Sequence, residues 1–323
     1  MHWLFTGKHW QILFTVLLLA EPCLSSAGQE TLNYQGLNRT YYVHVPENLK
    51  QGASLVVVLH GYTSSAETIM SYSGMNEVAD ANNFIAVYPQ GTVDSLGNTF
   101  FNVGYAFHAD SAVDDVGFIE ALVVKMQTAY ELDPKNTFAT GMSNGGDMSY
   151  LLACTKSAVF SAVAPVAGVM MKTTLDTCEP KRNIPIFEIH GTKDEISRFA
   201  GDLNNDDGWG AYYDLPSTIA FWVKRHGLDR KTIDAVPDKD TSDGSHILFE
   251  RYFSSSHVNE VWFYKVEGGQ HTWPGWSADI KWWKNPLFWY YLRNGNNDIN
   301  ASHQIWSFFE QYRNNISTLE TKP

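Results

Sequence analysis

The 323-residue sequence predicts one α/β domain built on a doubly wound, mostly parallel sheet. Short apolar runs alternate with segments of helical periodicity, as expected for a parallel sheet that is covered by helices on both faces. The sequence has no internal repeat and no linker long enough to divide it. We therefore expect a single domain over residues 28–323, preceded by a segment at residues 1–27 that is not part of the fold.

The apolar runs place seven strands. Several runs are apolar on both faces, which is typical of buried parallel strands. The predicted strands cover residues 40–45, 54–60, 84–89, 136–141, 161–168, 184–191 and 260–269. Helical spacing follows an Asp cap at residues 114–132, follows a Ser cap at Ser217 in residues 217–227, and recurs at residues 301–315.

Composition excludes some partners. The net charge of -12 leaves no basic stripe that could neutralise nucleic-acid phosphates, and it also disfavours anionic membrane surfaces. Aromatic residues are abundant, and five of the 11 Trp lie within residues 273–291. That segment is either an inserted unit that buries its own rings or a platform at a cleft mouth, with Trp273 and Trp276 facing substrate. We expect a monomer.

The N-terminus has the pattern of a signal peptide. Lys8 precedes an apolar run at residues 12–20, and Ser25 and Ala27 fit the small-residue rule for cleavage before Gly28. The run is shorter than the roughly 20 residues that a spanning helix needs, which disfavours the alternative of an uncleaved anchor. The mature chain is therefore predicted to be secreted, either outside the cell or into a periplasm.

Export makes the cysteine count informative. Cleavage removes Cys23 and leaves Cys154 and Cys178, which form either a disulfide or two buried thiols. Three sequons would be glycosylation sites if the host glycosylates. They are Asn38, Asn300 and Asn315.

A glycine-flanked serine stands between a predicted strand and a predicted helix. Gly141-Met142-Ser143-Asn144-Gly145 has the pattern G-x-S-x-G, in which the glycines let a strained serine project from a sharp strand-to-helix turn. The helix that follows directs free N–H groups at a developing oxyanion. A serine that only caps the helix is the alternative.

A base and an acid follow later in the chain. His271 comes just after a strand, in a loop with paired glycines before it and Pro274-Gly275 after it. Asp194 follows the strand at 184–191, four residues after His190, so the order Ser, Asp, His is the one known for such folds. Asp202, Asp206 and Asp207 are weaker candidates in a solvated turn, and the His-Gly histidines that end other strands, His60 and His190, are interpreted as structural.

Backbone N–H groups are the expected oxyanion donors. Asn144 follows the nucleophile and supplies one donor. The second is expected from Tyr62 or Thr63, where Gly61 lets the chain approach closely.

The chain resembles the secreted esterases of the polyhydroxybutyrate depolymerase and feruloyl esterase type, within the α/β-hydrolase fold. The resemblance rests on "LHGYTSSAE", "YPQGT", "DDVGFI", "TGMSNGGDMSY", "SAVAPVAG", "HGTKDEI", "PSTIAFW", "GGQHTWPG" and "INASHQIWSFF", which cover nearly all of residues 40–310 in order. It implies Ser143, Asp194 and His271 as a catalytic triad, a Cys154–Cys178 bridge, and Trp273 beside the active site. The chain departs from the family at Tyr62 and Gln270, where neither change removes a catalytic group.

These observations predict a serine hydrolase of carboxylic esters that works through an acyl-enzyme and needs no cofactor. Feruloyl or acetyl esters of plant polysaccharide are the expected substrates, and poly(3-hydroxyalkanoate) is the alternative. A peptidase on the same fold is disfavoured because there is no room for a gating domain. A non-catalytic, aromatic-rich carbohydrate-binding protein would explain the tryptophans but not the three catalytic groups. No metal is expected, since the acidic loops at 202–208 and 238–244 do not complete a calcium pattern.

Overall fold

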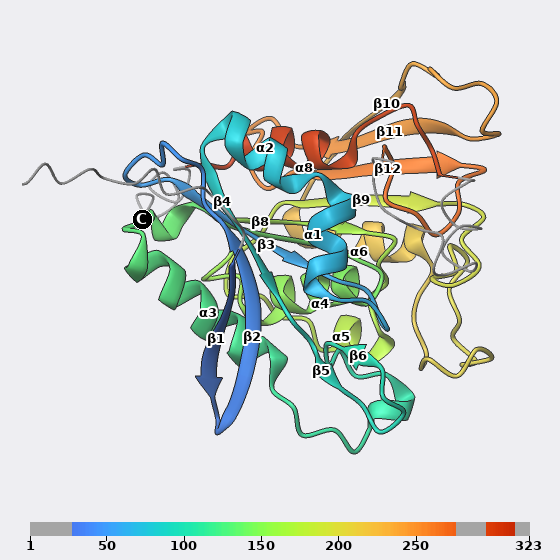
Figure 1. The fold of residues 1–323 in the computed structure, drawn as a ribbon. Coiled ribbons are helices and arrows are strands. Elements are labelled where there is room, and N and C mark those ends of the chain that lie inside the picture. The colour runs from blue at the N-terminus through green and yellow to red at the C-terminus, as the bar shows by residue number, and fades with distance from the viewer. Residues whose placement is uncertain (1–27, 276–294, 314–323) are drawn as a thin grey trace, which may run out of the picture.

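The structure, a computed structural model, describes residues 28–275 and 295–313 (Figure 1). Within these ranges a ten-stranded sheet has the order β1-β2-β4-β3-β7-β8-β9-β12-β11-β10. The strands are β1 Gly28–Tyr34, β2 Leu37–His44, β3 Ser54–Leu59, β4 Phe84–Pro89, β7 Thr137–Met142, β8 Ala162–Val166, β9 Ile186–Gly191, β10 Arg230–Ala235, β11 His246–Phe253 and β12 Val261–Glu267. A separate ribbon pairs β5 Thr92–Val93 with β6 Thr99–Phe100.

The sheet is parallel at its centre and antiparallel at both edges. β4, β3, β7, β8, β9 and β12 run parallel to one another. β2 and β1 extend one edge, and β11 and β10 extend the other, through antiparallel pairings. The predicted fold class is confirmed. All six central strands and β2 coincide with predicted strands to within a few residues.

Helices cover both faces of the sheet (Figure 1). They are α1 Ala66–Ser73, α2 Met75–Asn82, α3 Asp115–Ala129, α4 Asn144–Thr155, α5 Lys172–Asp176, α6 Leu215–His226 and α8 Ala301–Glu310, with short 3-10 turns at Ala106–His108 and Pro134–Asn136. None of the helices in the described ranges is long and apolar enough to cross a membrane.

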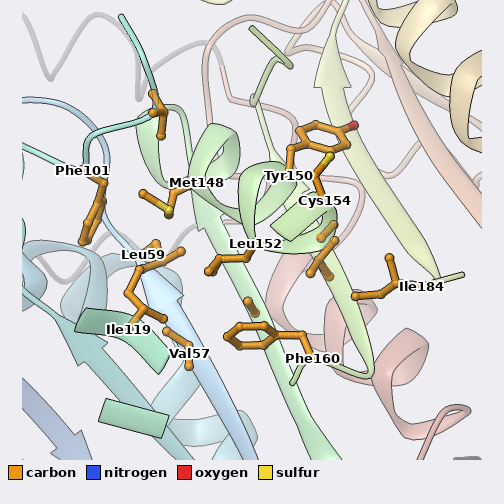
Figure 2. Close-up of a cluster of buried hydrophobic side chains, with 14 of the residues drawn as sticks. Val57, Leu59, Phe101, Ile119, Met148, Tyr150, Leu152, Cys154, Phe160 and Ile184 are labelled. Carbon is orange, nitrogen blue, oxygen red and sulfur yellow. The ribbon is translucent and has the colours of Figure 1, made fainter. Parts of the chain in front are cut away.

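Two hydrophobic cores lie on opposite faces of the sheet. Side chains alternate along β3, so Val57 and Leu59 join the core under α3, α4 and α6, whereas Val56 and Val58 join the core under α1, α2 and α8. Figure 2 shows the first core, where Leu152 of α4 faces the β3 side chains. Burial on both faces explains why the central strands are continuous apolar runs.

Sequence patterns missed the outer strands and placed one cap wrongly. β1 and β10 are polar and largely exposed, so no apolar run marks them. The predicted cap at Ser217 is wrong. Helix α6 begins earlier, and Asp214 caps it by accepting a hydrogen bond from the Ser217 N–H at 2.7 Å. Pro216 fits the first turn because no intrahelical N–H bond is needed there.

Candidate active site

Ser143 occupies a strained turn between β7 and α4. Its φ of 56° and ψ of -122° lie outside the regions that side-chain-bearing residues favour. The Ser143 N–H donates to the Val166 carbonyl at 2.9 Å, and the Asp147 N–H donates to the Ser143 carbonyl at 2.8 Å. The Ser143 side chain makes no capping hydrogen bond to α4 and instead lines a small pocket. A purely capping role for this serine therefore has no support in the geometry.

The glycine on the helix side of Ser143 has no room for a side chain. A Cβ on Gly145 would lie 2.1 Å from the Leu59 carbonyl oxygen of β3. This close approach brings the start of α4 against the end of β3, and it places Ser143 beside the loop that begins at Gly61. A Cβ on Gly61 would lie 3.3 Å from the Ser143 Cβ.

Asp194 and His271 meet at the ends of β9 and β12. His271 Nδ1 lies 2.8 Å from Asp194 Oδ2, and the other Asp194 oxygen accepts hydrogen bonds from the N–H groups of Ile196 and Ser197, each at 2.8 Å. Three bonds fix this carboxylate, so the imidazole that it contacts is held in one orientation. Asp194 is 5% exposed and His271 is half-buried.

The two loops that carry Asp194 and His271 are hydrogen-bonded to each other. The Lys193 N–H donates to the Gly269 carbonyl at 2.8 Å, and the Thr192 N–H donates to the Val266 carbonyl at 2.9 Å. The Gly268 N–H donates to Thr192 Oγ1 at 2.9 Å. The paired glycines before His271 therefore let two backbones run in close contact, and they do not mark a freely moving loop.

The structure separates the two candidates for the second oxyanion donor. The Thr63 N–H donates to the Thr99 carbonyl at 2.9 Å, so the prediction that it faces an oxyanion is wrong. In the described residues the Tyr62 N–H has no such bond. Its peptide plane is held by His60, whose Nδ1 lies 2.7 Å from the Gly61 carbonyl oxygen.

His60 is a neutral donor in this arrangement. Burial lowers the pKa of His60 to about 4, although its bond to the Gly61 carbonyl opposes the shift. His60 Nε2 accepts from the Gly91 N–H at 2.9 Å, so Nδ1 carries the ring proton.

The side chain of Asn144 joins two segments of the site. Its buried side chain donates to the Phe101 carbonyl at 3.0 Å and accepts from the Phe101 N–H at 2.7 Å. This paired contact fixes the loop after β6 against the start of α4. The N–H of Asn144 itself belongs to the first turn of α4, where backbone donors lack intrahelical partners.

Aromatic residues form one part of the pocket at Ser143. Trp209 and Tyr105 have ring centroids 5.2 Å apart, and Tyr62 lies edge-on to Trp209 at 5.5 Å. The pocket is lined by Tyr105, Ser143, Asp147, Val169, Met171, Ile196, Ser197, Trp209 and Tyr212. Sequence reasoning missed Tyr105, Trp209 and Tyr212 because they come from loops far apart in the chain.

A buried carboxyl group also lines the pocket. Asp147 is 4% exposed, accepts from the Tyr105 hydroxyl at 2.6 Å and accepts from the Val169 N–H at 2.7 Å. Burial raises the pKa of Asp147 to about 7, although the Tyr105 hydrogen bond opposes the shift. Its place four residues after Ser143 on α4 was the available sequence signal.

Trp273 does not face the pocket. It is 1% exposed, belongs to the core under α1, α2 and α8, and packs edge-on against Tyr72 at 6.3 Å. The prediction that Trp273 faces substrate is therefore wrong, because its ring is buried in this core. Trp276 and the rest of the aromatic segment to residue 291 lie outside the described residues.

The remaining predicted sites are the cysteine pair, the three sequons and the signal peptide. Cys154 and Cys178 form a disulfide that ties the end of α4 to the segment before β9. Asn38 is exposed, and Asn300 caps α8 by accepting from the His303 N–H at 3.0 Å. Asn315 and the signal peptide predicted at 1–27 lie outside the described residues.

Similar proteins point to one class of enzyme. Residues 39–178 match the family described as esterase PHB depolymerase. Feruloyl esterase D of Neurospora crassa is 25% identical over 304 residues, which are 90% of this chain and 88% of that protein. Poly(3-hydroxyalkanoate) depolymerase C of Paucimonas lemoignei is 31% identical over 204 residues, which are 63% of this chain and 47% of that protein. The chain thus spans less than half of the depolymerase's length.

A solved structure shows the same fold. Acetyl xylan esterase from Aspergillus awamori superposes with a TM-score of 0.56 at 18% identity, covering 76% of this chain and 94% of that one. At this level of identity the likeness shows the α/β-hydrolase fold alone.

Proposed function

We propose that the chain is an esterase of the family whose model matches residues 39–178, and that it hydrolyses carboxylic esters with Ser143, His271 and Asp194 as its triad. One observation carries the proposal. A serine in a strained strand-to-helix turn lines a pocket, and the strand ends beside it carry a histidine bonded to a buried aspartate.

The chemistry follows the ordinary acyl-enzyme course. Ser143 Oγ attacks the ester carbonyl while His271 Nε2 accepts its proton, and the same imidazolium then protonates the leaving alkoxide. Asp194 holds His271 through Nδ1 and stabilises the imidazolium. The N–H groups of Asn144 and Tyr62 are the proposed donors to the oxyanion, and a water molecule finally releases the acid and regenerates Ser143.

Hydroxycinnamoyl or acetyl esters of plant polysaccharide are the proposed substrates. The aromatic lining by Tyr105, Trp209 and Tyr212 supports an aromatic acyl group, since stacked or edge-on rings stabilise one another. The second candidate is poly(3-hydroxyalkanoate), which is favoured by the 31% identity to a depolymerase of that polymer. We further propose export of the mature chain, a view supported by the N-terminal pattern and by the disulfide.

Hydrolysis by wild type and by Ser143→Ala tests the proposal. The assay compares p-nitrophenyl acetate, methyl ferulate and a poly(3-hydroxybutyrate) suspension. We expect Ser143→Ala to lower kcat by about 10⁴-fold or more, because the nucleophile is lost while binding groups remain. Ser157→Ala, which removes a buried hydroxyl just beyond α4, is the matched control and should keep its activity.

Each substrate then has a distinct meaning. Cleavage of methyl ferulate without release from the polymer supports the polysaccharide esters, and the reverse result supports the depolymerase. Equal activity of wild type and Ser143→Ala on every ester would show that Ser143 is not the nucleophile, and the proposed triad would be wrong. Ligand binding without any Ser143-dependent hydrolysis would favour the carbohydrate-binding alternative.

A further inference from the structure

A second histidine–carboxylate pair lies directly behind Asp194. His190 lies one residue before the end of β9, and its Nδ1 lies 2.9 Å from Glu188 Oε1 two residues earlier on the same strand. Its Nε2 lies 2.7 Å from the Ser197 carbonyl oxygen and 3.5 Å from Asp194 Oδ2. The side chains of His190, Glu188 and Asp194 are all fully buried. A continuous chain of contacts therefore runs from Glu188 through His190 and Asp194 to His271.

The partners of His190 fix where its protons lie. A backbone carbonyl only accepts hydrogen bonds, so Nε2 must carry a proton toward Ser197. Nδ1 faces a carboxylate oxygen, and one further proton lies between the two atoms. With that proton on Nδ1 the ring is an imidazolium flanked by two carboxylates, an arrangement that Coulomb attraction favours strongly in a buried site.

The surroundings of His190 are predominantly acidic. Burial favours the neutral ring, but the hydrogen bond to Glu188 and the charges of Asp194 and Glu188 outweigh burial and raise the pKa of His190. Burial raises the pKa of Glu188 to about 7, and its hydrogen bond to His190 opposes the shift. Besides His190 and Glu188 themselves, the titratable groups at this place are Asp194 after β9, His271 after β12, and Asp147 and Tyr150 on α4.

We propose that His190 and Glu188 are a positioning pair for the catalytic acid, in which the His190 imidazolium anchors Asp194 from behind and reduces the negative charge that Asp194 presents to His271. The pair touches neither substrate nor the reacting atoms. Its effect rests on the proposed triad, because it acts on His271 only through Asp194.

The pair has a measurable consequence for the pH dependence of the reaction. The acid limb of the kcat/KM profile reports protonation of the base. Without the cation behind Asp194, the carboxylate attracts the proton on the base more strongly, so the acid limb moves to higher pH. We expect a shift of about one pH unit for a charge at this separation. Looser positioning of Asp194 should also lower kcat by about tenfold with little change in KM.

The test compares His190→Gln, Glu188→Gln and the double variant. A glutamine at 190 retains an amide donor that can reach the Ser197 carbonyl but carries no charge. Glu188→Gln keeps the size of the side chain and removes the carboxylate that supports the imidazolium. Because the two groups act as one unit, each single variant should move the acid limb by about as much as the double variant does.

His226→Gln is the matched control. His226 is also a mostly buried histidine bonded to a backbone carbonyl, with Nδ1 2.8 Å from the Asn259 carbonyl oxygen. Burial lowers its pKa to about 4, and no carboxylate in the described part of the chain pairs with it. Its replacement should lower thermal stability without moving the pH profile. If His190→Gln and Glu188→Gln behave like this control, the pair is only structural and the proposal fails.

A measurement on wild type does not depend on activity or on the folding of variants. At pH 8, ¹⁵N NMR of histidine-labelled protein should show an imidazolium with both ring nitrogens protonated. A spectrum without an imidazolium at that pH overturns the proposal. Active wild type with an inactive Ser143→Ala but an unmoved acid limb in both pair variants would overturn this inference alone. If the proposed triad itself is wrong, hydrolysis will not depend on Ser143.

Discussion

The central strands of the sheet and its outer strands differ in burial and in how closely their backbones are packed. β3 and β9 are buried at every residue, and the turns that follow the central strands carry Tyr62, Ser143, Asp194 and His271. β10, at one edge, is exposed at every residue. Backbone atoms touch backbone atoms where the central strands end, whereas the outer turns have open space around them. The proposed catalytic groups therefore follow the strands that are most completely buried, where we expect substitutions to be tolerated least.

The sharpest contrast is expected between two glycine-to-alanine changes. In Gly145→Ala the new methyl group would lie 2.1 Å from the Leu59 carbonyl oxygen, a backbone atom that cannot move without displacing β3. We expect loss of about 4 kcal/mol or more of folding free energy and no measurable ester hydrolysis. Urea unfolding and the p-nitrophenyl acetate assay measure the two effects.

Gly36→Ala is the edge counterpart. Gly36 lies in the turn between β1 and β2 with a φ of 79° and no atom near its would-be Cβ. Its replacement should cost only about 1–2 kcal/mol of backbone strain and leave hydrolysis unchanged. Gly145→Ala with activity near that of Gly36→Ala would mean that the close approach of α4 to β3 does not position Ser143.

A smaller effect is expected from Asp147, the buried carboxyl group at the pocket. Its pKa is about 7 in the folded protein, against 3.8 for the free group. Between these values the folded state keeps a proton that the unfolded state has lost, so the free energy of unfolding falls as pH rises from about 4 to about 7.

Asp147→Asn should reduce the decrease in the free energy of unfolding between pH 4 and pH 7. An asparagine can still accept from the Val169 N–H and remain within reach of the Tyr105 hydroxyl. The loss of unfolding free energy between pH 5 and pH 8 should therefore shrink by about 2 kcal/mol. The control is Asp80→Asn on α2, whose side chain is 53% exposed. An equal change in both variants would show that Asp147 titrates like a surface group.

Sequence reasoning reached the features that are local to a strand and its turn. Ser143 between its glycines, Asp194 after an apolar run and His271 after paired glycines are each visible within about ten residues. The central strands were predictable because burial on both faces requires continuous apolar residues. The structure brings Asp194 and His271 into contact as the order of the motifs suggested.

Features that depend on distant segments were missed or misjudged. The aromatic side of the pocket combines Tyr105 with Trp209, which lies about a hundred residues later in the chain. The sequence around either residue does not indicate that the two are in contact. The direction of Trp273 depends on a core formed with α1 and α8. His190 was interpreted as structural because the spacing of Glu188, His190 and Asp194 has a meaning only once β9 is extended and its following turn is folded.

The smallest predicted effect compares the same methylene deletion at the centre and at the edge. Ile186 begins β9 and is fully buried between β8 and β12, whereas Ile233 in β10 is 55% exposed. Ile186→Val should lower the free energy of unfolding by about 1 kcal/mol, because the lost atoms leave a cavity that packed strands cannot close. Ile233→Val should change it by less than about 0.5 kcal/mol, since solvent fills the space. Chemical denaturation of the two variants side by side measures the difference. Equal losses would mean that the outer strands are packed as tightly as the centre, and the tolerance of the edge would then need another explanation.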